Sequence, residues 1–224
     1  MPNRFGKKNI LIKEETIIMK KLIKISGITN IVCAVLLLLS WFSIGIFMWT
    51  EIGNQDFSAM VQNSAWIPIN IFYLIATILL LPGIIGLYLQ QLEKYGNWSL
   101  AGLLVTLLAI IWFSCIQFYE TFFWPLIAAE SPALFQAVGF SPSNKLIFTQ
   151  LMLSAVPWAV GFILLGIFTY RSGFITKWTV ILFTSGAVLF GIGMAFPIRT
   201  LGVIIFCIGL IKYGIVLKRG IIKQ

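Results

Sequence analysis

The chain has 224 residues, of which 59% are hydrophobic and only 10% are charged. Its mean hydropathy of +0.98 excludes an ordinary water-soluble fold of this length. The formal net charge of +9 does not indicate nucleic-acid binding, because Lys and Arg flank apolar blocks and form no separate basic domain. The chain has no histidine and no carboxylate cluster, so we expect no metal site and no cofactor.

Residues 1–24 form a basic N-terminal segment, with seven Lys or Arg and two Glu among isoleucines and leucines. The pattern is typical of an amphipathic segment lying on anionic lipids, and a disordered tail is the alternative. Met19-Lys20-Lys21 and the apolar run that follows resemble the start of a signal peptide, but no small-residue cleavage site comes after them. Since this run is about 25 residues long, we expect it to remain as a first membrane span.

Six apolar blocks are long enough to cross a hydrocarbon core of about 30 Å as α-helices. The sequence therefore predicts an all-α integral membrane bundle, with one six-helix domain over residues 25–217 and a basic cytoplasmic tail over residues 218–224. The predicted spans are residues 25–49, 66–88, 98–121, 146–168, 178–196 and 201–217. Residues 196–200 would form a tight turn between the last two spans.

The longest predicted connection is the loop over residues 122–145. Ser131 and Pro132 have the residue types of an N-cap and a first helical position. Three apolar residues follow on one helical face: Leu134, Phe135 and Val138. We therefore expect a short interfacial helix in this loop, with Ser143 or Asn144 capping the fourth span.

The distribution of Lys and Arg predicts the orientation of the bundle. With the N-terminus inside, thirteen of these residues lie in cytoplasmic segments, and only Lys145 and Arg199 lie in outer ones. Positive residues are retained on the cytoplasmic side of a membrane. We therefore expect both termini in the cytoplasm, lipid as the main partner, anionic lipids at the N-terminal segment and no nucleic acid.

A partial repeat occurs at an offset of 80 residues. Gly86-Leu87-Tyr88 and Trp98-Ser99 correspond to Gly166-Ile167-Phe168 and Trp178-Thr179. One interpretation is a parallel repeat of helical hairpins, an arrangement that some transporters use. The other is that interfacial tryptophans and glycines at helix ends recur in any such hairpin.

Glu120, near the outer end of the third span, is the most informative single residue, because a carboxylate there is costly unless it pairs, titrates or faces water. Gln117 lies three residues earlier on the same helical face. Four more polar residues lie at outer-half depth: Asn70, Gln150, Ser154 and Arg199. These residues predict an outward-facing polar cavity with Glu120 as a proton or cation site. In the alternative, Glu120 only pairs with Arg199 or Lys145, and the amides and hydroxyls link helices.

Small residues and prolines in the spans indicate how the helices pack and bend. Ala187, Gly191 and Ala195 form a small-xxx-small ridge that permits close helix packing, either within the bundle or in a dimer. Three prolines lie in the second and fourth spans: Pro68, Pro82 and Pro157. Such prolines free carbonyls at the binding sites of transporters, although they also kink ordinary membrane helices.

Three stretches resemble a group of uncharacterised small bacterial multi-pass membrane proteins: residues 79–91 (LLLPGIIGLYLQQ), 112–128 (WFSCIQFYETFFWPLIA) and 175–193 (ITKWTVILFTSGAVLFGIG). The group's F-x-E-x-F-x-x-P-x-L-A pattern is matched by six residues: Phe118, Glu120, Phe122, Pro125, Leu126 and Ala128. The resemblance implies a location in the bacterial plasma membrane and singles out Glu120. It implies no activity.

The sequence contains no Walker loop, no GxGxxG, no nucleophile elbow and no paired catalytic carboxylates, so we do not expect an enzyme. Glu120, the prolines and the partial repeat favour a small-solute or ion transporter or a transport-accessory subunit. The lack of an unmistakable site favours a non-catalytic scaffold, immunity or stress-response protein. Both hypotheses leave open a homo-oligomer or a partner membrane subunit.

Overall fold

The computed structural model describes residues 4–54, 56–133, 135, 145–192 and 196–219. These residues form helices and no strand, which confirms the predicted all-α class for the described part of the chain. In chain order the helices are α1 (Arg4–Phe47), α2 (Trp49–Gly53), α3 (Phe57–Gln62), α4 (Trp66–Leu89), α5 (Leu92–Glu130), α7 (Lys145–Ser172), α8 (Lys177–Ile192) and α9 (Phe196–Arg219).

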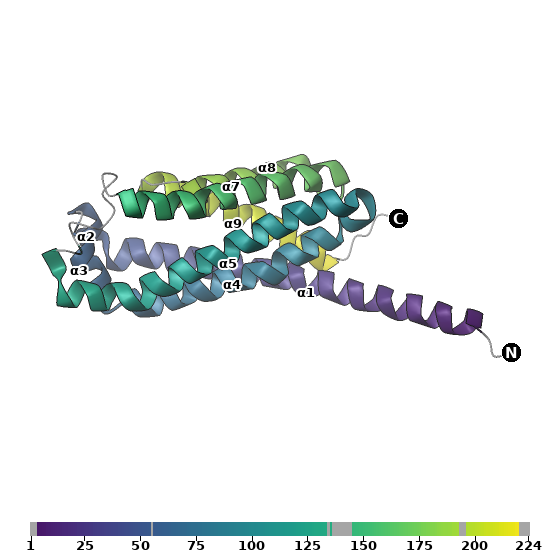
Figure 1. The fold of residues 1–224 in the computed structure, drawn as a ribbon, viewed down its shortest axis with the longest axis horizontal. Helices are drawn as coiled ribbons and strands as arrows, with labels where there is room; N and C mark the ends of the chain where they lie inside the picture. Colours follow the sequence, from purple (N-terminus) through teal and green to yellow (C-terminus); the bar gives the residue numbers. More distant parts are fainter. Residues whose placement is uncertain (1–3, 55, 134, 136–144, 193–195, 220–224) are drawn as a thin grey trace.

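The six longer helices pack as a closed ring in the order α1, α4, α5, α7, α8, α9 and back to α1. The short helices α2 and α3 lie at one end of the bundle, which we call the α2–α3 end (Figure 1). Helix α1 begins, and α9 ends, at the opposite end, which we call the N/C end (Figure 1). The basic first half of α1 projects beyond the bundle there.

Five of the described helices are long and apolar enough to cross a membrane. They are α4 and parts of α1, α5, α7 and α9. Helix α8 is also apolar but has 16 residues, which rise about 24 Å and fall short of a hydrocarbon core of about 30 Å. The chain is thus a helical bundle of membrane-protein type, in which five helices reach spanning length by themselves.

The helices differ from the predicted spans at several boundaries. Helix α1 continues through the basic segment, since residues 4–26 contain no proline to interrupt it. Helix α5 reaches Glu130, so the prediction that a loop begins at residue 122 is wrong. Most of the predicted interfacial helix, and both candidate caps of the fourth span, lie outside the described residues.

The predicted turn at residues 196–200 is also wrong, because these residues form the first turn of α9. Pro197 explains the difference. The first turn of a helix leaves its backbone N–H groups without intrahelical acceptors, so a proline costs little there and its fixed φ favours a helix start.

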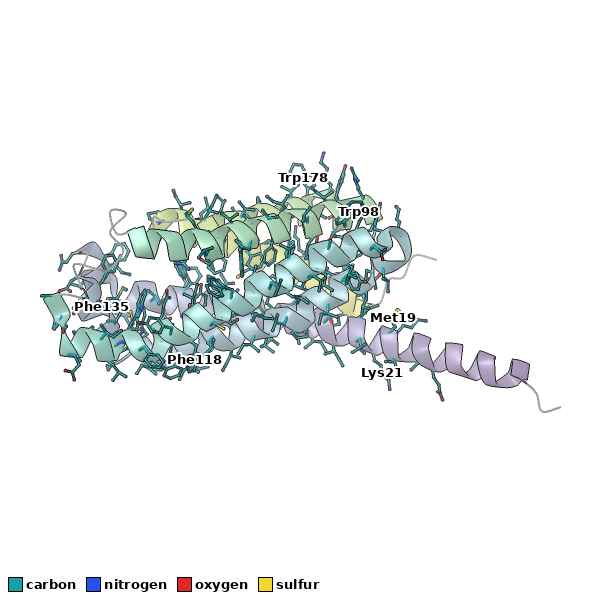
Figure 2. All side chains as sticks on the ribbon, viewed as in Figure 1. Met19, Lys21, Trp98, Phe118, Phe135 and Trp178 are labelled. Atoms are coloured by element: carbon teal, nitrogen blue, oxygen red, sulfur yellow. The ribbon has the colours of Figure 1, made fainter. Side chains whose placement is uncertain are left out.

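Aromatic side chains fill the middle of the ring on the side formed by α7, α8 and α9. The ring centroids of this aromatic column lie 4.7–6.4 Å apart. Its members are all almost fully buried: Trp158, Phe162, Phe183, Phe190 and Phe206. Large apolar side chains also cover the outer faces of the helices, as Figure 2 shows. An apolar exterior around a packed interior is the arrangement expected of helices in lipid.

Glycines bring α8 and α9 into close contact. A Cβ atom added to Gly186 would overlap the backbone of Phe206, and one added to Gly202 would overlap the backbone of Phe190. Further along, a Cβ atom added to Gly209 would lie 2.6 Å from the Cα atom of Phe183. The two backbones therefore approach as closely as small residues allow.

Candidate functional site

A buried pair of amides links α4 to α5 near the α2–α3 end. The Gln117 side chain donates from Nε2 to Oδ1 of Asn70 over 2.8 Å. Asn70 in turn donates from Nδ2 to the backbone carbonyl of Trp66, and the Trp66 indole donates to the backbone carbonyl of Glu120. These bonds hold Glu120 on α5 at the level of the first turns of α4.

Arg199 enters the ring from the first turn of α9. Its guanidinium carbon lies 5.5 Å from the centre of the Trp41 ring on α1 and 5.5 Å from the Phe190 ring on α8. The Trp41 indole donates a 2.7 Å hydrogen bond to the Thr200 hydroxyl, which holds α1 against α9 at this depth. The Nε atom of Arg199 is buried and has no hydrogen-bond partner among the described residues.

Tyr73 on α4 is the third polar side chain at this level, and it is only 4% exposed. Its ring packs edge-on against Phe113 and against Phe190, the ring that Arg199 also contacts. Its hydroxyl lies beside the Arg199 side chain and has no other hydrogen-bond partner within the described part of the chain. Tyr73 lies one helical turn from Asn70, on the same face of α4.

Glu120, Arg199 and Tyr73 lie near one another, and we call these three residues the charged cluster. Glu120 is half-buried. Among the described side chains, its carboxylate has no hydrogen bond and no ion pair with Arg199. The Glu120 and Arg199 side chains are therefore near one another without direct contact.

The structure describes only some of the other residues predicted for the site or for helix packing. Ser154 is buried on α7. The side chains of Gln150 and Lys145 lie outside the described part of the structure, as does all of Ala195. Gly191 packs against the ring of Trp158, whose indole donates to the backbone carbonyl of Ala187, so this part of the small-residue ridge faces α7.

Tyr73 and Trp41 are not among the site residues predicted from the sequence. Aromatic residues are frequent in membrane spans, so neither has a distinguishing pattern of its own. The spacing of Tyr73 from Asn70 is the signal that could have identified it, because residues three apart share a helical face.

A hollow of about 450 Å³ lies at the α2–α3 end of the bundle. Its walls come from α3 and from the residues just after α5: Asp56, Ser58, Ala59, Gln62, Pro132 and Ala133. None of the residues predicted to line a polar cavity borders this hollow. Within the described residues, no group of three or more Cys, Asp or Glu is placed to hold a metal ion.

The two halves of the partial sequence repeat meet at the N/C end. Gln91 donates a 2.6 Å hydrogen bond to Thr169, and Lys94 donates a 2.8 Å hydrogen bond to the backbone carbonyl of Arg171. Trp98 and Trp178 lie at this end with 75% and 71% of their surface exposed (Figure 2). The segments that follow α4 and end α7, which belong to the two halves of the repeat, thus lie side by side.

Comparison of the chain with protein-family models, curated proteins and solved structures finds no match.

Proposed function

We propose that the chain is a transporter, or a transport-accessory subunit, that binds a small solute or ion at the charged cluster. The proposal rests on one observation, that among the described residues the buried Nε of Arg199 has no hydrogen-bond partner and no ion pair joins Arg199 to Glu120. Charged side chains inside membrane helices are costly and usually serve a function. Two opposite charges needed only for packing would be most stable in direct contact. Because Glu120 and Arg199 do not pair, their polar atoms remain available to bind a solute.

In this proposal α8 is a sixth span, and the N/C end faces the cytoplasm of a bacterial cell. Five basic residues at the helix ends support this orientation: Lys94, Arg171, Lys177, Lys218 and Arg219. The α2–α3 end carries the acidic residues Glu51, Asp56 and Glu130 instead. Positive residues are retained on the cytoplasmic side. The projecting basic part of α1 would then contact anionic lipids of the inner leaflet.

The aromatic column defines the direction of access in this proposal. Phe183 and Phe206 lie further toward the N/C end than Arg199, as their positions along α8 and α9 indicate. Their packed rings would close the charged cluster from the cytoplasm. A solute would therefore reach Glu120 and Arg199 from the α2–α3 end, which is the outer side.

A second candidate is a non-catalytic membrane scaffold, immunity or stress-response protein. The same aromatic column favours it, because rings that fill the centre of the ring of helices leave that part of the bundle tightly packed. In this case the charged cluster only fixes α9 against α1 and α4.

An uptake assay in proteoliposomes distinguishes the two candidates. Wild-type protein is tested with a panel of labelled inorganic ions, amino acids, carboxylates and amines. We expect at least one to accumulate above protein-free vesicles, and Glu120→Gln to reduce that uptake by about tenfold or more at equal protein content. Glu130→Gln is the matched control, because Glu130 is exposed at the end of the same helix. No accumulation of any compound, or normal uptake by Glu120→Gln, would favour the scaffold.

A further inference from the structure

We propose that the chain holds one anionic phospholipid on the face that α5, α7 and α8 present at the N/C end, which we call the lipid site. Arg171 and Lys177 would contact the lipid phosphate, and an acyl chain would lie along the exposed face of α7. Helix α7 is opposite α1 in the ring, so the lipid site is separate from the projecting basic part of α1. It also does not depend on solute binding at the charged cluster.

Lys94 ties the start of α5 to the end of α7. Its ammonium group donates a 2.8 Å hydrogen bond to the backbone carbonyl of Arg171. The rings of Tyr95 and Phe168 join the same two helices, with their centres 5.7 Å apart. The side chains of Lys94 and Arg171 are both exposed. Two positive charges therefore lie close together on the surface, and a bound anion would relieve their repulsion.

The short turn between α7 and α8 adds a third positive charge. Lys177 begins α8 six positions after Arg171. Gly173 has a φ of +75° and its N–H donates to the carbonyl of Tyr170, while Ile175 in the same turn is buried. The charged groups of Arg171 and Lys177 are exposed and have no hydrogen bond or ion pair with other described residues. The anchored turn therefore leaves both sets of N–H donors available to a phosphate.

Aromatic side chains surround these basic groups. Trp98 on α5 and Trp178 on α8 are 75% and 71% exposed, and both lie at the N/C end (Figure 2). Tyr170 is 52% exposed on α7, the helix between α5 and α8 in the ring. Tryptophan and tyrosine favour the headgroup level of a bilayer, because one part of each ring system is apolar and the other is polar. The basic groups are thus at the level where lipid phosphates lie.

The exposed face of α7 provides a surface for an acyl chain. Val160, Ile163 and Ile167 are each exposed, and their spacing of three or four residues places them on one helical face with Tyr170. This apolar face starts about one turn from Arg171 and continues toward the α2–α3 end. A phospholipid has the same order of groups, from phosphate through glycerol to acyl chain. A free phosphate ion would match only the basic groups, so the apolar face favours a lipid.

The charge of the lipid site favours an anionic headgroup. The two segments that carry it, residues 92–98 and 168–178, contain three basic residues and one acidic residue, Glu93. Basic residues near the membrane surface attract anionic lipids. A zwitterionic headgroup brings a positive charge with its phosphate, and this excess of Lys and Arg would repel it. Phosphatidylglycerol should therefore bind better than phosphatidylcholine.

The direct test is native mass spectrometry of the purified full-length protein in detergent. Phosphatidylglycerol or phosphatidylcholine with the same acyl chains is titrated into the wild-type protein. We expect one phosphatidylglycerol molecule to bind with about tenfold or greater affinity than phosphatidylcholine, because two to three basic side chains attract its phosphate. Glycerol phosphate at the same concentration should not displace the lipid, because it has no acyl chain to contact α7.

Two double variants with equal changes of charge then locate the lipid. Arg171→Gln with Lys177→Gln should lower the affinity for phosphatidylglycerol to that for phosphatidylcholine. Lys20→Gln with Lys21→Gln is the matched control, because both lysines are exposed on the projecting part of α1 (Figure 2). That part would contact a bilayer surface as a whole, so the control should retain the single lipid as wild type does. Size-exclusion profiles identify any variant that fails to fold.

Three outcomes would overturn the inference. If phosphatidylcholine binds wild type as tightly as phosphatidylglycerol, the basic groups do not select the lipid, and this result needs no variant. If both double variants lose phosphatidylglycerol equally, the attraction is a general one and no site exists at the turn between α7 and α8. If glycerol phosphate displaces the lipid, the site takes a phosphate ion. Uptake in proteoliposomes is measured separately, so each of these results leaves the proposed function standing.

Discussion

At the scale of single residues, some buried polar side chains of the bundle satisfy one another. Asn70 and Gln117 illustrate this, because each amide is buried and each uses the other or a backbone carbonyl as its partner. Removing one partner leaves the other with an unsatisfied atom in an environment without water, which is more costly than removing both.

We predict that Gln117→Met destabilises the folded protein by about 1 kcal/mol, because it leaves Oδ1 of Asn70 without its donor. Adding Asn70→Leu should recover part of this loss. Thermal unfolding of the three variants in one detergent provides the double-mutant cycle. Ser185→Ala is the control, because the exposed Ser185 hydroxyl bonds only within its own helix. Additive effects of the two substitutions would contradict a specific amide pair.

Polar residues in membrane spans are rare and costly, so the sequence is enough to identify Glu120, Gln117, Asn70 and Arg199. It is not enough to predict how these residues are arranged in space. Glu120 and Arg199 are 79 positions apart in the sequence, and only the packing of α5 and α9 into one ring determines whether they pair or stay apart. The orientation of Trp41 and Tyr73 is likewise a property of that packing.

At the scale of helices, the apolar blocks predict where spans occur but not where helices end. Helix α4 agrees closely with its predicted span, since the turns that flank it contain polar residues. Helix α5 passes its predicted end because Phe122, Phe123 and Trp124 continue its apolar surface and Pro125 does not interrupt it. The small-residue ridge at Ala187 and Gly191 can be predicted from the sequence, whereas the contact of Gly186 with α9 belongs to no pattern that the sequence shows.

We predict that Gly186→Ala destabilises the protein by about 1–3 kcal/mol, because the new methyl group overlaps the backbone of Phe206 on α9. Gly45→Ala is the matched control, since nothing lies within 4 Å of a Cβ atom added there. The control should be neutral or slightly stabilising, as alanine favours a helix more than glycine does. Melting temperature and the monodisperse fraction after detergent extraction report both effects. Equal behaviour of the two variants would mean that α8 and α9 are not in close contact.

At the scale of the whole molecule, composition and the length of the apolar blocks are enough to predict a helical membrane bundle. They are not enough to predict a closed ring, because every helix is apolar on most of its surface and no periodic pattern marks its neighbours. The ring order depends on small residues at particular contacts, such as Gly27 against the backbone of Lys218, which joins α1 to α9. That contact places the middle of α1 beside the last turn of α9.

The number of crossings then determines where the chain ends lie. Helix α8 runs between α7 and α9 and packs against both, and we predict that it crosses the membrane despite having 16 residues. A short span is tolerated at modest cost when the bilayer thins locally or neighbouring helices cover the helix. With α8 as a sixth span, the number of crossings is even, and both termini should be cytoplasmic, on the side with more Lys and Arg.

Reporter fusions in a bacterial host test this topology. A fluorescent protein fused after Gln224 should fluoresce, and alkaline phosphatase inserted after Asn54, between α2 and α3, should be active, because that enzyme works only outside the cytoplasm. A fusion after Gly173, in the turn between α7 and α8, should behave like the C-terminal one. If α8 did not cross, the fusions after Gly173 and Gln224 would report opposite sides. An aqueous path from outside to Glu120 and Arg199 would then require a different arrangement of α9, since Arg199 lies in its first turn.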